Sequence, residues 1–338
     1  MSGSVAIESV AYELPLHRIS SAFIEEQLAG TMSRLRIPPG QLVGLTGIRE
    51  RRFWPPGVMP SDVATQAARK AIEATSINPE EIGCLISTSV CKDYIEPSVA
   101  ALVHGNIGLP PGCLNFDIGN ACLGFMTGMN TIINMIESGM IKYGLVVAGE
   151  GSREPIEATI RRLQSREVTV RDFFNNFATL TLGSGAAAVI LSHRDISNSS
   201  HIIKGSASLA ATQHCRLCFG HKDQMIADAA SVMTHGVELA YQTWKLASEN
   251  LENWSDETID HYIPHQVSAR NMEALNKRLG LTPEKAHLNF HTLGNIGPAA
   301  IPITLGMAED ENKLKPGDHI ALMGIGSGLN CTMMSVIW

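Results

Sequence analysis

The sequence predicts an α/β fold made of two similar halves. Short runs of β-branched and other apolar residues alternate with longer helix-like stretches, which is the pattern of a fold with buried strands. Parts of the second half also echo the first, and an internal repeat sets the architecture of a chain. With 338 residues, the chain can bury a large core in two domains or in one doubled fold.

The apolar runs place the main elements in chain order. Their β-branched residues predict strands at Ile82–Val90, Leu145–Gly149, Thr179–Ser192, Ile259–Pro264, His319–Gly324 and Cys331–Trp338. Longer amphipathic stretches predict helices at Pro60–Thr75, Cys122–Gly139, Thr234–Asn250 and Ser268–Leu279. The segment His265–Val267 is expected to be the turn between a strand and the last of these helices.

The internal repeat relates Cys122 to Asn295. Cys122 opens a helix-like stretch that ends in Met-Ile-Glu and is followed by the strand Leu-Val-Val-Ala-Gly. Asn295 opens a stretch that ends in Met-Ala-Glu and is followed by Ile-Ala-Leu-Met-Gly. A Gly-Ser-Gly tripeptide leads into a strand in each half, at 183–185 and 326–328. Two such halves, with their helix N-termini meeting at a shared centre, would bring Cys122 and Asn295 together.

The boundary between the halves is expected in the polar stretch 192–200. The N-terminal half is then 1–196 and the C-terminal half 197–338. Residues 151–182 carry charges and few β-branched runs, so we expect them to form an insertion that caps the site rather than part of the core.

The bulk composition argues against several classes of protein. Charged residues make up 17% of the chain and the formal net charge is −7, so an acidic balance without a basic run argues against nucleic acid as the main partner. No apolar run reaches the roughly 18 residues that a membrane span needs. The N-terminal residues lack the pattern of a signal peptide. We therefore expect a cytoplasmic protein without a membrane span.

Cysteine spacing gives one further candidate site. The seven cysteines are an odd, scattered set, which is not a disulfide framework. Cys215 and Cys218 form a Cys-x-x-Cys pair flanked by His214 and His221, so a zinc or redox role is an alternative there. A structural zinc site usually draws two such pairs from separate turns, and the sequence has no second pair, so we expect no metal site.

Cys122 is the candidate nucleophile. It stands in Phe-Asp-Ile-Gly-Asn-Ala-Cys-Leu-Gly-Phe, between a strand-like run and a helix-like run. A thiol at the start of a helix meets unpaired amides and the positive end of the helix dipole, and both favour the thiolate. Because a thiolate attacks thioesters well, the position indicates acyl transfer. The alternative is a buried structural cysteine, since free cysteine is among the most buried residue types.

Two other segments supply partners for this thiol. His265 follows Ile-Pro at a strand end, and Asn295 stands in Gly-Asn-Ile-Gly-Pro at the mouth of a helix. Taken singly, such residues are more often part of a core or a turn. With Cys122 they form a Cys/His/Asn set, and the chain resembles the thiolase superfamily of condensing enzymes over nearly its whole length, in the branch of ketoacyl-ACP synthase III (FabH). The resemblance implies two βαβαβ halves that form five layers, αβαβα, which agrees with the repeat.

The resemblance also implies roles for single residues. Cys122 would take the first acyl group as a thioester, while His265 and Asn295 would hydrogen-bond the carbonyl of the second thioester and stabilise its enolate. The backbone amides of Cys122 and Ser327 match the pair that forms the other oxyanion site. Amides at a helix start and in a Gly-Ser-Gly turn suit that role. Coenzyme A is carried by the substrate, so no cofactor of the protein is implied.

Glu96 separates two reactions. Ketoacyl-ACP synthase III enzymes usually carry an aromatic residue where Glu96 stands, because the loss of CO2 from malonyl-ACP makes the carbanion without a strong base. Joining two ordinary acyl-CoAs requires the removal of an α-proton, and a carboxylate in an apolar pocket is suited to that work. A glutamate here is the feature of the olefin-biosynthesis condensing enzymes (OleA), in which it comes from the other subunit of a dimer. The alternative is a solvated loop carboxylate.

The binding of coenzyme A is expected to differ from that in synthase III. Those enzymes carry a Trp and an Arg that sandwich the adenine, and the matching places here are Gln41 and Leu45. Coenzyme A must then be held otherwise, and Arg216 and Lys222 are the candidates for contacts with its phosphates. The alternative for both residues is ordinary surface charge.

We therefore expect a homodimeric acyltransferase that joins two fatty acyl-CoAs head to head, without decarboxylation, into a long-chain 2-alkyl-3-keto acid. Its partners would be its acyl-CoA substrates, a second copy and enzymes of a downstream pathway. The alternative reaction is condensation of acyl-CoA with malonyl-ACP, or acyl transfer to another acceptor. A third possibility is a non-catalytic partner of the same fold, but such partners have typically lost the cysteine that this chain keeps.

Overall fold

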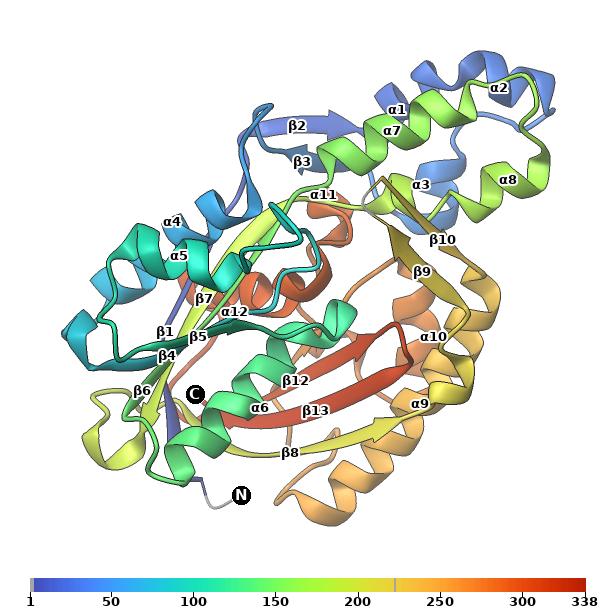
Figure 1. Ribbon diagram of the computed structural model, residues 1–338. Coiled ribbons are helices and arrows are strands. Elements are labelled where there is room, and N and C mark those ends of the chain that lie inside the picture. The colour runs from blue at the N-terminus through green and yellow to red at the C-terminus, as the bar shows by residue number, and fades with distance from the viewer. Residues whose placement is uncertain (1–2, 222) are drawn as a thin grey trace.

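A computed structural model describes residues 3–221 and 223–338 of the chain (Figure 1). The helices are α1 (Ser21–Gln27), α2 (Ala29–Arg34), α3 (Gln41–Thr46), α4 (Pro60–Glu73), α5 (Val99–Ile107), α6 (Gly124–Glu137), α7 (Arg153–Leu163), α8 (Val170–Asn175), α9 (Ala229–Asn250), α10 (Ala269–Leu279), α11 (Phe290–Leu293) and α12 (Ala300–Asp310). The strands are β1 (Val5–Glu13), β2 (His17–Ser20), β3 (Glu50–Phe53), β4 (Ile82–Ser87), β5 (Leu114–Asp117), β6 (Tyr143–Glu150), β7 (Gly185–His193), β8 (Ile202–Ala210), β9 (Cys218–His221), β10 (Gln224–Ala227), β11 (His261–Pro264), β12 (His319–Gly326) and β13 (Asn330–Ile337).

The main sheet has nine strands and two similar halves. Its order is β11-β12-β13-β8-β1-β7-β6-β4-β5. In the first half β4 is parallel to β6, and β7 is antiparallel to β6 and β1. In the second half β11 is parallel to β12, and β13 is antiparallel to β12 and β8. The halves join where Val5 and Ala6 of β1 pair with β8.

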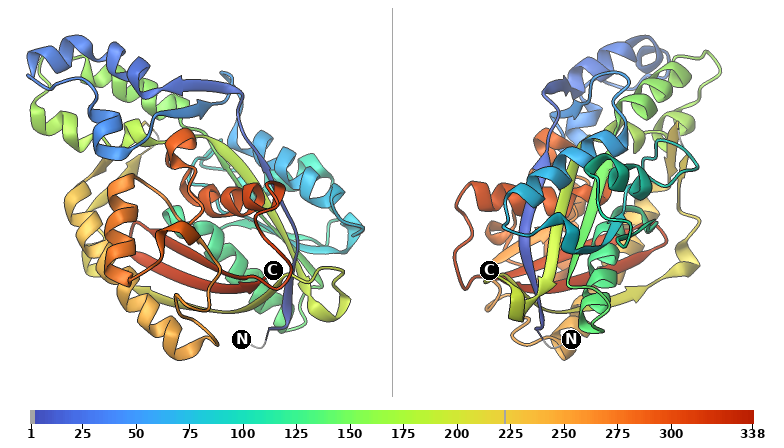
Figure 2. Two further views of the ribbon diagram at one scale, coloured as in Figure 1. Left: turned by 180° about the vertical axis from the view of Figure 1, so that it is seen from behind. Right: turned by 60° about the vertical axis from the view of Figure 1, so that its left-hand side comes forward.

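Helices fill three layers around the two halves of this sheet. α4 and α5 pack on the outer face of the first half, α9 packs on the outer face of the second, and α6 and α12 lie between them (Figures 1 and 2). Because side chains of a strand alternate in direction, Leu145 and Val147 face α4 while Val146 faces the middle layer. The observed layers are those of the thiolase-like fold that the sequence predicts.

The insertion packs against the N-terminal helices rather than into this core. α7 and α8 share a separate apolar cluster with α1 and α2, in which Phe173 and Leu28 are buried. Figure 1 shows this lobe projecting beside the hairpin β9–β10. Thr179 joins the lobe to that hairpin, because its side chain and the backbone of Met225 exchange two hydrogen bonds of 2.9 Å.

Two boundaries differ from the predicted ones for local reasons. The expected strand Thr179–Ser192 begins only at Gly185, because Thr179–Thr181 form a 3-10 turn stabilised by a hydrogen bond from the Thr181 hydroxyl to the Ala178 carbonyl. The helix expected from Cys122 begins at Gly124, after a 3-10 turn at Ala121–Leu123. The other predicted strands and helices are present, with ends that shift by a few residues.

Candidate active site

Cys122 lies at the centre of the molecule, in the short turn before α6. Ala121 has φ of +46°, an uncommon angle for a residue with a side chain, and it directs the chain sharply into the 3-10 turn Ala121–Leu123. The helix that follows is buried between the two halves of the sheet, with Phe125, Met126 and Met129 in the core. The turn therefore holds the thiol at a fixed place in the middle layer.

The surroundings of Cys122 keep its thiol protonated. Burial, together with the nearby Glu150 carboxylate and Cys218 thiol, raises the pKa of Cys122 to about 12. A hydrogen bond from its own backbone amide acts in the other direction but is a smaller effect. The expectation that the helix start favours a thiolate is therefore wrong for the protein without substrate, because desolvation of the charged form is the larger effect.

His265 stands directly after β11, beside the end of β12. Its backbone amide donates a hydrogen bond of 2.8 Å to the Met323 carbonyl, which fixes its position relative to β12. The side chain is buried, and its Nδ1 atom has no hydrogen-bond partner among the described residues. Burial lowers the pKa of His265 to about 4, so the imidazole is neutral near pH 7. A neutral ring with an unpaired buried nitrogen suits a group that hydrogen-bonds a ligand.

Asn295 is fixed by three hydrogen bonds. Its backbone amide donates to the Thr181 carbonyl over 2.9 Å, and its carbonyl accepts from the Gly183 amide over 2.7 Å. Its side-chain Oδ1 accepts a 3.0 Å bond from the amide of Gly297. Because Oδ1 is held in this way, the amide group Nδ2 is left to donate, and within the described chain no acceptor binds it. Thr181 and Gly183 precede β7, so the first half of the sheet positions a residue of the second.

The Gly-Ser-Gly turn after β12 lies against the turn that carries Cys122. A Cβ atom at Gly326 would lie 2.8 Å from the carbonyl oxygen of Asn120 and 2.9 Å from the amide nitrogen of Leu123, so only glycine permits this approach. Asn330 Nδ2 also donates a 3.0 Å hydrogen bond to Asn120 Oδ1. Ser327 is thus held next to the Cys122 turn. A backbone amide at this place can donate a hydrogen bond to an oxyanion.

Glu96 lies apart from these residues within one chain. It is exposed on the segment 88–98 between β4 and α5, and among the described residues it forms no hydrogen bond or ion pair. The neighbouring Ile95 is 100% exposed. The segment itself is anchored, because Asp93 accepts hydrogen bonds from the Ser61 amide (3.0 Å) and hydroxyl (2.5 Å). The exposed residues around Glu96 are therefore carried on an anchored segment.

The predicted coenzyme A contacts are placed only in part. Arg216 is exposed on the segment that leads into β9. Lys222 lies outside the described residues. The same segment carries Cys218, whose thiol is hydrogen-bonded to the side chain of Ser327 and close enough to raise the pKa of Cys122. Within residues 3–221 and 223–338, no group of three or more His, Cys, Asp and Glu side chains is arranged to hold a metal ion.

Sequence reasoning missed two residues that shape this centre. Glu150, the last residue of β6, is buried beside Cys122. Gln266 is buried next to His265, and its Oε1 accepts hydrogen bonds from the amides of Asn289 (2.7 Å) and Phe290 (3.0 Å). Gln266 thereby ties the histidine to the segment that leads to Asn295. A polar residue at or just past the end of an apolar strand was the available signal for both.

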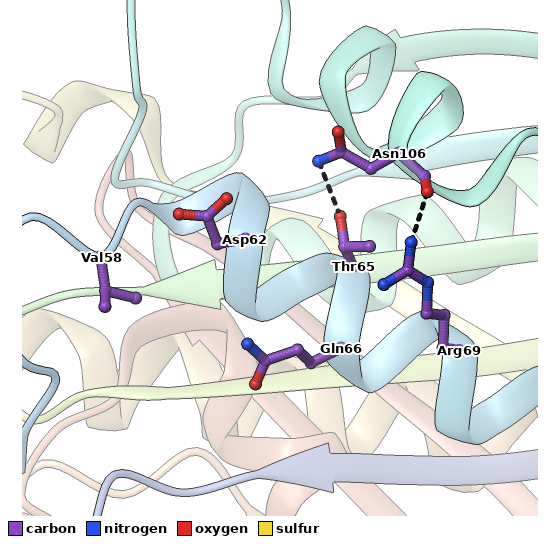
Figure 3. Close-up of a pocket in the computed structure, with 6 residues that line it drawn as sticks. All are labelled: Val58, Asp62, Thr65, Gln66, Arg69 and Asn106. Atoms are coloured by element: carbon purple, nitrogen blue, oxygen red, sulfur yellow. Dashed lines mark hydrogen bonds between the residues drawn. The ribbon is translucent and has the colours of Figure 1, made fainter.

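One cavity is separate from this centre. It has a volume of about 420 Å³ and opens on the solvent side of α4, near α5; its lining residues are Val58, Asp62, Thr65, Gln66, Arg69 and Asn106 (Figure 3). Asn106 closes one side, because its Nδ2 donates to Thr65 Oγ1 over 3.2 Å and its carbonyl accepts from Arg69 over 2.6 Å. The candidate residues named above do not line it.

In the described part of the chain, no helix is long and apolar enough to cross a membrane.

Comparison with known proteins identifies the family. The model of 3-oxoacyl-[acyl-carrier-protein] synthase III matches residues 116–208, and the model of its C-terminal part matches residues 250–338. The acyl-CoA:acyl-CoA alkyltransferase of Xanthomonas campestris is 42% identical over 335 residues, and that of Shewanella oneidensis is 41% identical over 348 residues. Both alignments cover 99% of this chain and 99% of the relative.

Solved structures agree with this result. A crystal structure of a variant of Xanthomonas campestris OleA with bound lauric acid and lauroyl-CoA has a TM-score of 0.97 at 41% identity, and covers 99% of both chains. A cerulenin-bound structure of the same enzyme has a TM-score of 0.96 at 42% identity, over 99% of this chain and 97% of that one. This chain therefore belongs to the OleA family of acyl-CoA:acyl-CoA alkyltransferases, which are thiolase-fold acyltransferases related to ketoacyl-ACP synthase III.

Proposed function

We propose that the protein joins two fatty acyl-CoAs head to head, without decarboxylation, and releases a long-chain 2-alkyl-3-keto acid. The observation that carries the proposal is the placement of Glu96 beside two exposed apolar side chains, Tyr94 and Ile95, on an anchored segment. A carboxylate flanked in this way is suited to enter an apolar pocket and remove an α-proton. The activity named for the relatives supports the same reaction.

In the first step, Cys122 takes an acyl group. Its sulfur attacks the thioester carbonyl of the first acyl-CoA, the bond to the coenzyme A sulfur breaks, and the thiol proton leaves with coenzyme A. The backbone amides of Cys122 and Ser327 hydrogen-bond the oxyanion that forms. A donor of this kind is worth about 3–4 kcal/mol of barrier. The high pKa of Cys122 means that the proton must move as the substrate reacts rather than beforehand.

In the second step, a carbanion forms on the second acyl-CoA. Glu96 of the partner subunit removes an α-proton, and the resulting enolate oxygen is stabilised by hydrogen bonds from His265 and from Asn295 Nδ2. The neutral state of His265 fits a hydrogen-bond donor better than a base, because burial disfavours its charged form. The fixed orientation of Asn295 supplies the second donor without reorganisation.

In the third step, the carbon–carbon bond forms. The enolate carbon attacks the acyl group on Cys122, and the cysteine leaves and regains a proton. The product is a 2-alkyl-3-ketoacyl-CoA, and water hydrolyses its remaining thioester to release the acid and coenzyme A. We assign contacts with the coenzyme A phosphates to Arg216, which is exposed on the segment that leads to Cys218, and to Lys222 as a basic residue close to it in the sequence.

The proposal includes a homodimer. β5 is an edge strand whose one neighbour is β4, and an open edge can pair with a second copy of itself. Leu114 on β5 is 50% exposed. Lys92, in the segment that carries Glu96, forms a 2.9 Å ion pair with Asp117 of β5. The edge and the Glu96 segment therefore form one surface, so a copy seated on the edge would meet Glu96.

The test is to incubate the pure protein with tetradecanoyl-CoA alone. Release of coenzyme A is followed with a thiol reagent, and organic products are followed by mass spectrometry. A 3-keto acid, or the ketone left after it loses CO2, supports the proposal. Product that forms only when malonyl-ACP is added would replace it with the decarboxylative reaction.

The role of Glu96 is tested with two variants. Glu96→Gln should still acylate Cys122 but stall before the carbon–carbon bond forms, while Glu167→Gln, an exposed change on the insertion, should act like the wild type. If Glu96 acts across a dimer, mixing Glu96→Gln with Cys122→Ala restores one working site in each mixed dimer. Free exchange of subunits would then return about a quarter of the activity. No return of activity would place Glu96 outside the partner's site.

A further inference from the structure

The buried carboxylate of Glu150 has no role in the steps above. Glu150 ends β6 and is 5% exposed. Among the described residues no basic side chain pairs with it, although a buried carboxylate normally has such a partner. Its place at the end of a central strand, beside Cys122, makes it the strongest unassigned group of the site.

On one side, Glu150 holds the base of the Glu96 segment. Its Oε1 accepts a 2.7 Å hydrogen bond from the amide of Val90, and its Oε2 accepts a 3.2 Å bond from the amide of Cys91. These two amides begin the segment 88–98. With the Asp93–Ser61 contacts, they fix the direction in which the exposed tip leaves the molecule.

On the other side, Glu150 faces the nucleophile and the enolate-binding segment. Gly297 has φ of +57°, and a Cβ atom there would lie 3.8 Å from Cδ and Oε2 of Glu150. The amide of Gly297 is the donor that orients Asn295. The turns that carry Cys122 and Gly297 also pack on each other. One carboxyl group therefore contacts both the start of the Glu96 segment and the Gly297 turn, which packs on the turn of Cys122.

We propose that Glu150 is a positioning residue that links the two half-reactions: it fixes the segment that carries Glu96 to the partner's site, and its carboxylate lies against the Gly297 turn and acts from there on Cys122 of its own subunit. The first part rests on the proposed function. The second part rests on the contact of Glu150 with the Gly297 turn, which packs on the turn that carries Cys122. Glu150 therefore acts through other residues rather than on the substrate.

The charges around Glu150 agree with this assignment. Its pKa is raised to about 7, chiefly by burial, so it is partly ionised near neutral pH. The titratable groups that face it are Cys91, from the segment 88–98, and Cys122, from the turn before α6; Glu154 of α7 acts on Cys91 in turn. The anionic form of Glu150 raises the pKa of Cys122, so neutralising it makes the thiolate easier to form.

The first experiment measures the reaction of Cys122 with iodoacetamide across pH, using mass spectrometry to quantify the modified peptide. Glu150→Gln removes the charge at nearly constant size, so alkylation at pH 8 should be about 3- to 10-fold faster than in the wild type. Glu150→Asp keeps the charge and should stay within about twofold of the wild type. An unchanged rate in Glu150→Gln overturns the electrostatic part.

The second experiment measures condensation in the same variants. Gln has one acceptor oxygen, so its NH2 group would face the Cys91 amide where Oε2 of Glu150 accepts, and Asp is one methylene too short to reach both amides. Both variants should therefore lose condensation about tenfold while acylation of Cys122 is kept. Wild-type condensation in Glu150→Asp overturns the positioning part. Glu167→Gln, which removes one exposed carboxylate, is the matched control for both experiments.

These readouts separate the inference from general damage and from the proposed function. A purely structural role would lower alkylation and condensation together, whereas the proposal requires them to change in opposite directions in Glu150→Gln. Should that variant fail to fold, Glu150→Asp still tests the positioning part, and the wild type still tests the charge. The alkylation rate of wild-type Cys122 should rise less than tenfold per pH unit near pH 7, where Glu150 ionises. A constant tenfold slope would contradict the effect of Glu150 on Cys122. Alkylation needs no substrate, so this test of Glu150 remains valid even if the wild type carries out no condensation.

Discussion

The two halves of the sheet present the same backbone but different chemistry. β4 and β11 occupy equivalent places, each parallel to the strand that follows a central helix, yet β4 is followed by Thr88 and β11 by His265. The central helices are preceded by Cys122 in the first half and by Asn295 in the second. The comparison shows that the two halves share one backbone frame. Single residues at the ends of its strands and helices give the first half a thiol and the second half an imidazole and an amide.

The outer edges of the halves differ as well. The first half ends in β5, which pairs with β4 along four residues. At the equivalent place in the second half the pairing shrinks to a single bridge between Tyr262 and Ala286. The first half therefore offers an edge that a second copy can extend, and it is also the half that carries Glu96.

The largest effect is expected from Cys122→Ala. Removal of the sulfur should abolish labelling of the protein by acyl-CoA and all condensation, because the thioester cannot form. Intact-protein mass spectrometry measures the acyl adduct. Cys215→Ala, which changes an exposed cysteine, should keep both activities. An acyl adduct on Cys122→Ala would place the nucleophile elsewhere.

The next largest effect is expected from the second half. Asn295→Ala removes one oriented donor and should lower the condensation rate about 10²- to 10³-fold, while acylation falls much less. Single-turnover kinetics of the two steps measure the difference. Asn134→Ala, at an exposed position of α6, is the control. Equal losses in both steps would assign Asn295 a structural role.

The pH dependence of Cys122 alkylation tests whether burial controls the pKa of this thiol. Its pKa of about 12 lies above the working range, so the thiolate fraction should rise about tenfold per pH unit between about pH 8 and pH 10, with no plateau. Iodoacetamide labelling of the Cys122 peptide gives the profile. A plateau near pH 8 would show that the helix start, and not desolvation, controls this thiol.

The smallest effect concerns the packing of α6 against the sheet. A Cβ atom at Gly128 would lie 2.7 Å from Thr88 Cγ2 and 3.0 Å from Val146 Cγ1, so Gly128→Ala should cost about 1–3 kcal/mol of unfolding free energy. Urea unfolding measures the change. Gly105→Ala, on α5 with no neighbour within 4 Å, should instead be neutral or raise it by up to about 1 kcal/mol. Equal outcomes would mean that α6 can move away from the sheet.

Much of this arrangement could be predicted from the sequence, because repeats and strand ends leave clear patterns. The echo between the segments of Cys122 and Asn295 predicted that two helix starts meet in the middle layer, and the turns that precede α6 and α12 do pack on each other. The buried strands were recognisable because their apolar runs are continuous. Family resemblance supplied what the pattern could not, namely the roles given to Glu96 and Ser327.

The remaining features depend on long-range packing that no local pattern records. The thiol of Cys122 was expected to ionise easily, but its pKa is set by burial and by Glu150 and Cys218, which are distant in the sequence. Glu150 ends a strand as many surface residues do, and its burial becomes visible only when the segment 88–98 folds over it. Sequence reasoning therefore finds reacting groups more readily than the residues that tune them.

The enclosure of α6 and α12 has a consequence for how the protein can change over evolutionary time. α12 is apolar on nearly every side, and from Ala300 to Gly306 each of its residues is buried. A substitution there must suit both halves of the sheet at once, so acceptable changes need compensation from two directions. The lobe of α1, α2, α7 and α8 has its own apolar cluster and avoids this constraint. Substitutions should therefore accumulate faster in the lobe than in the central pair of helices.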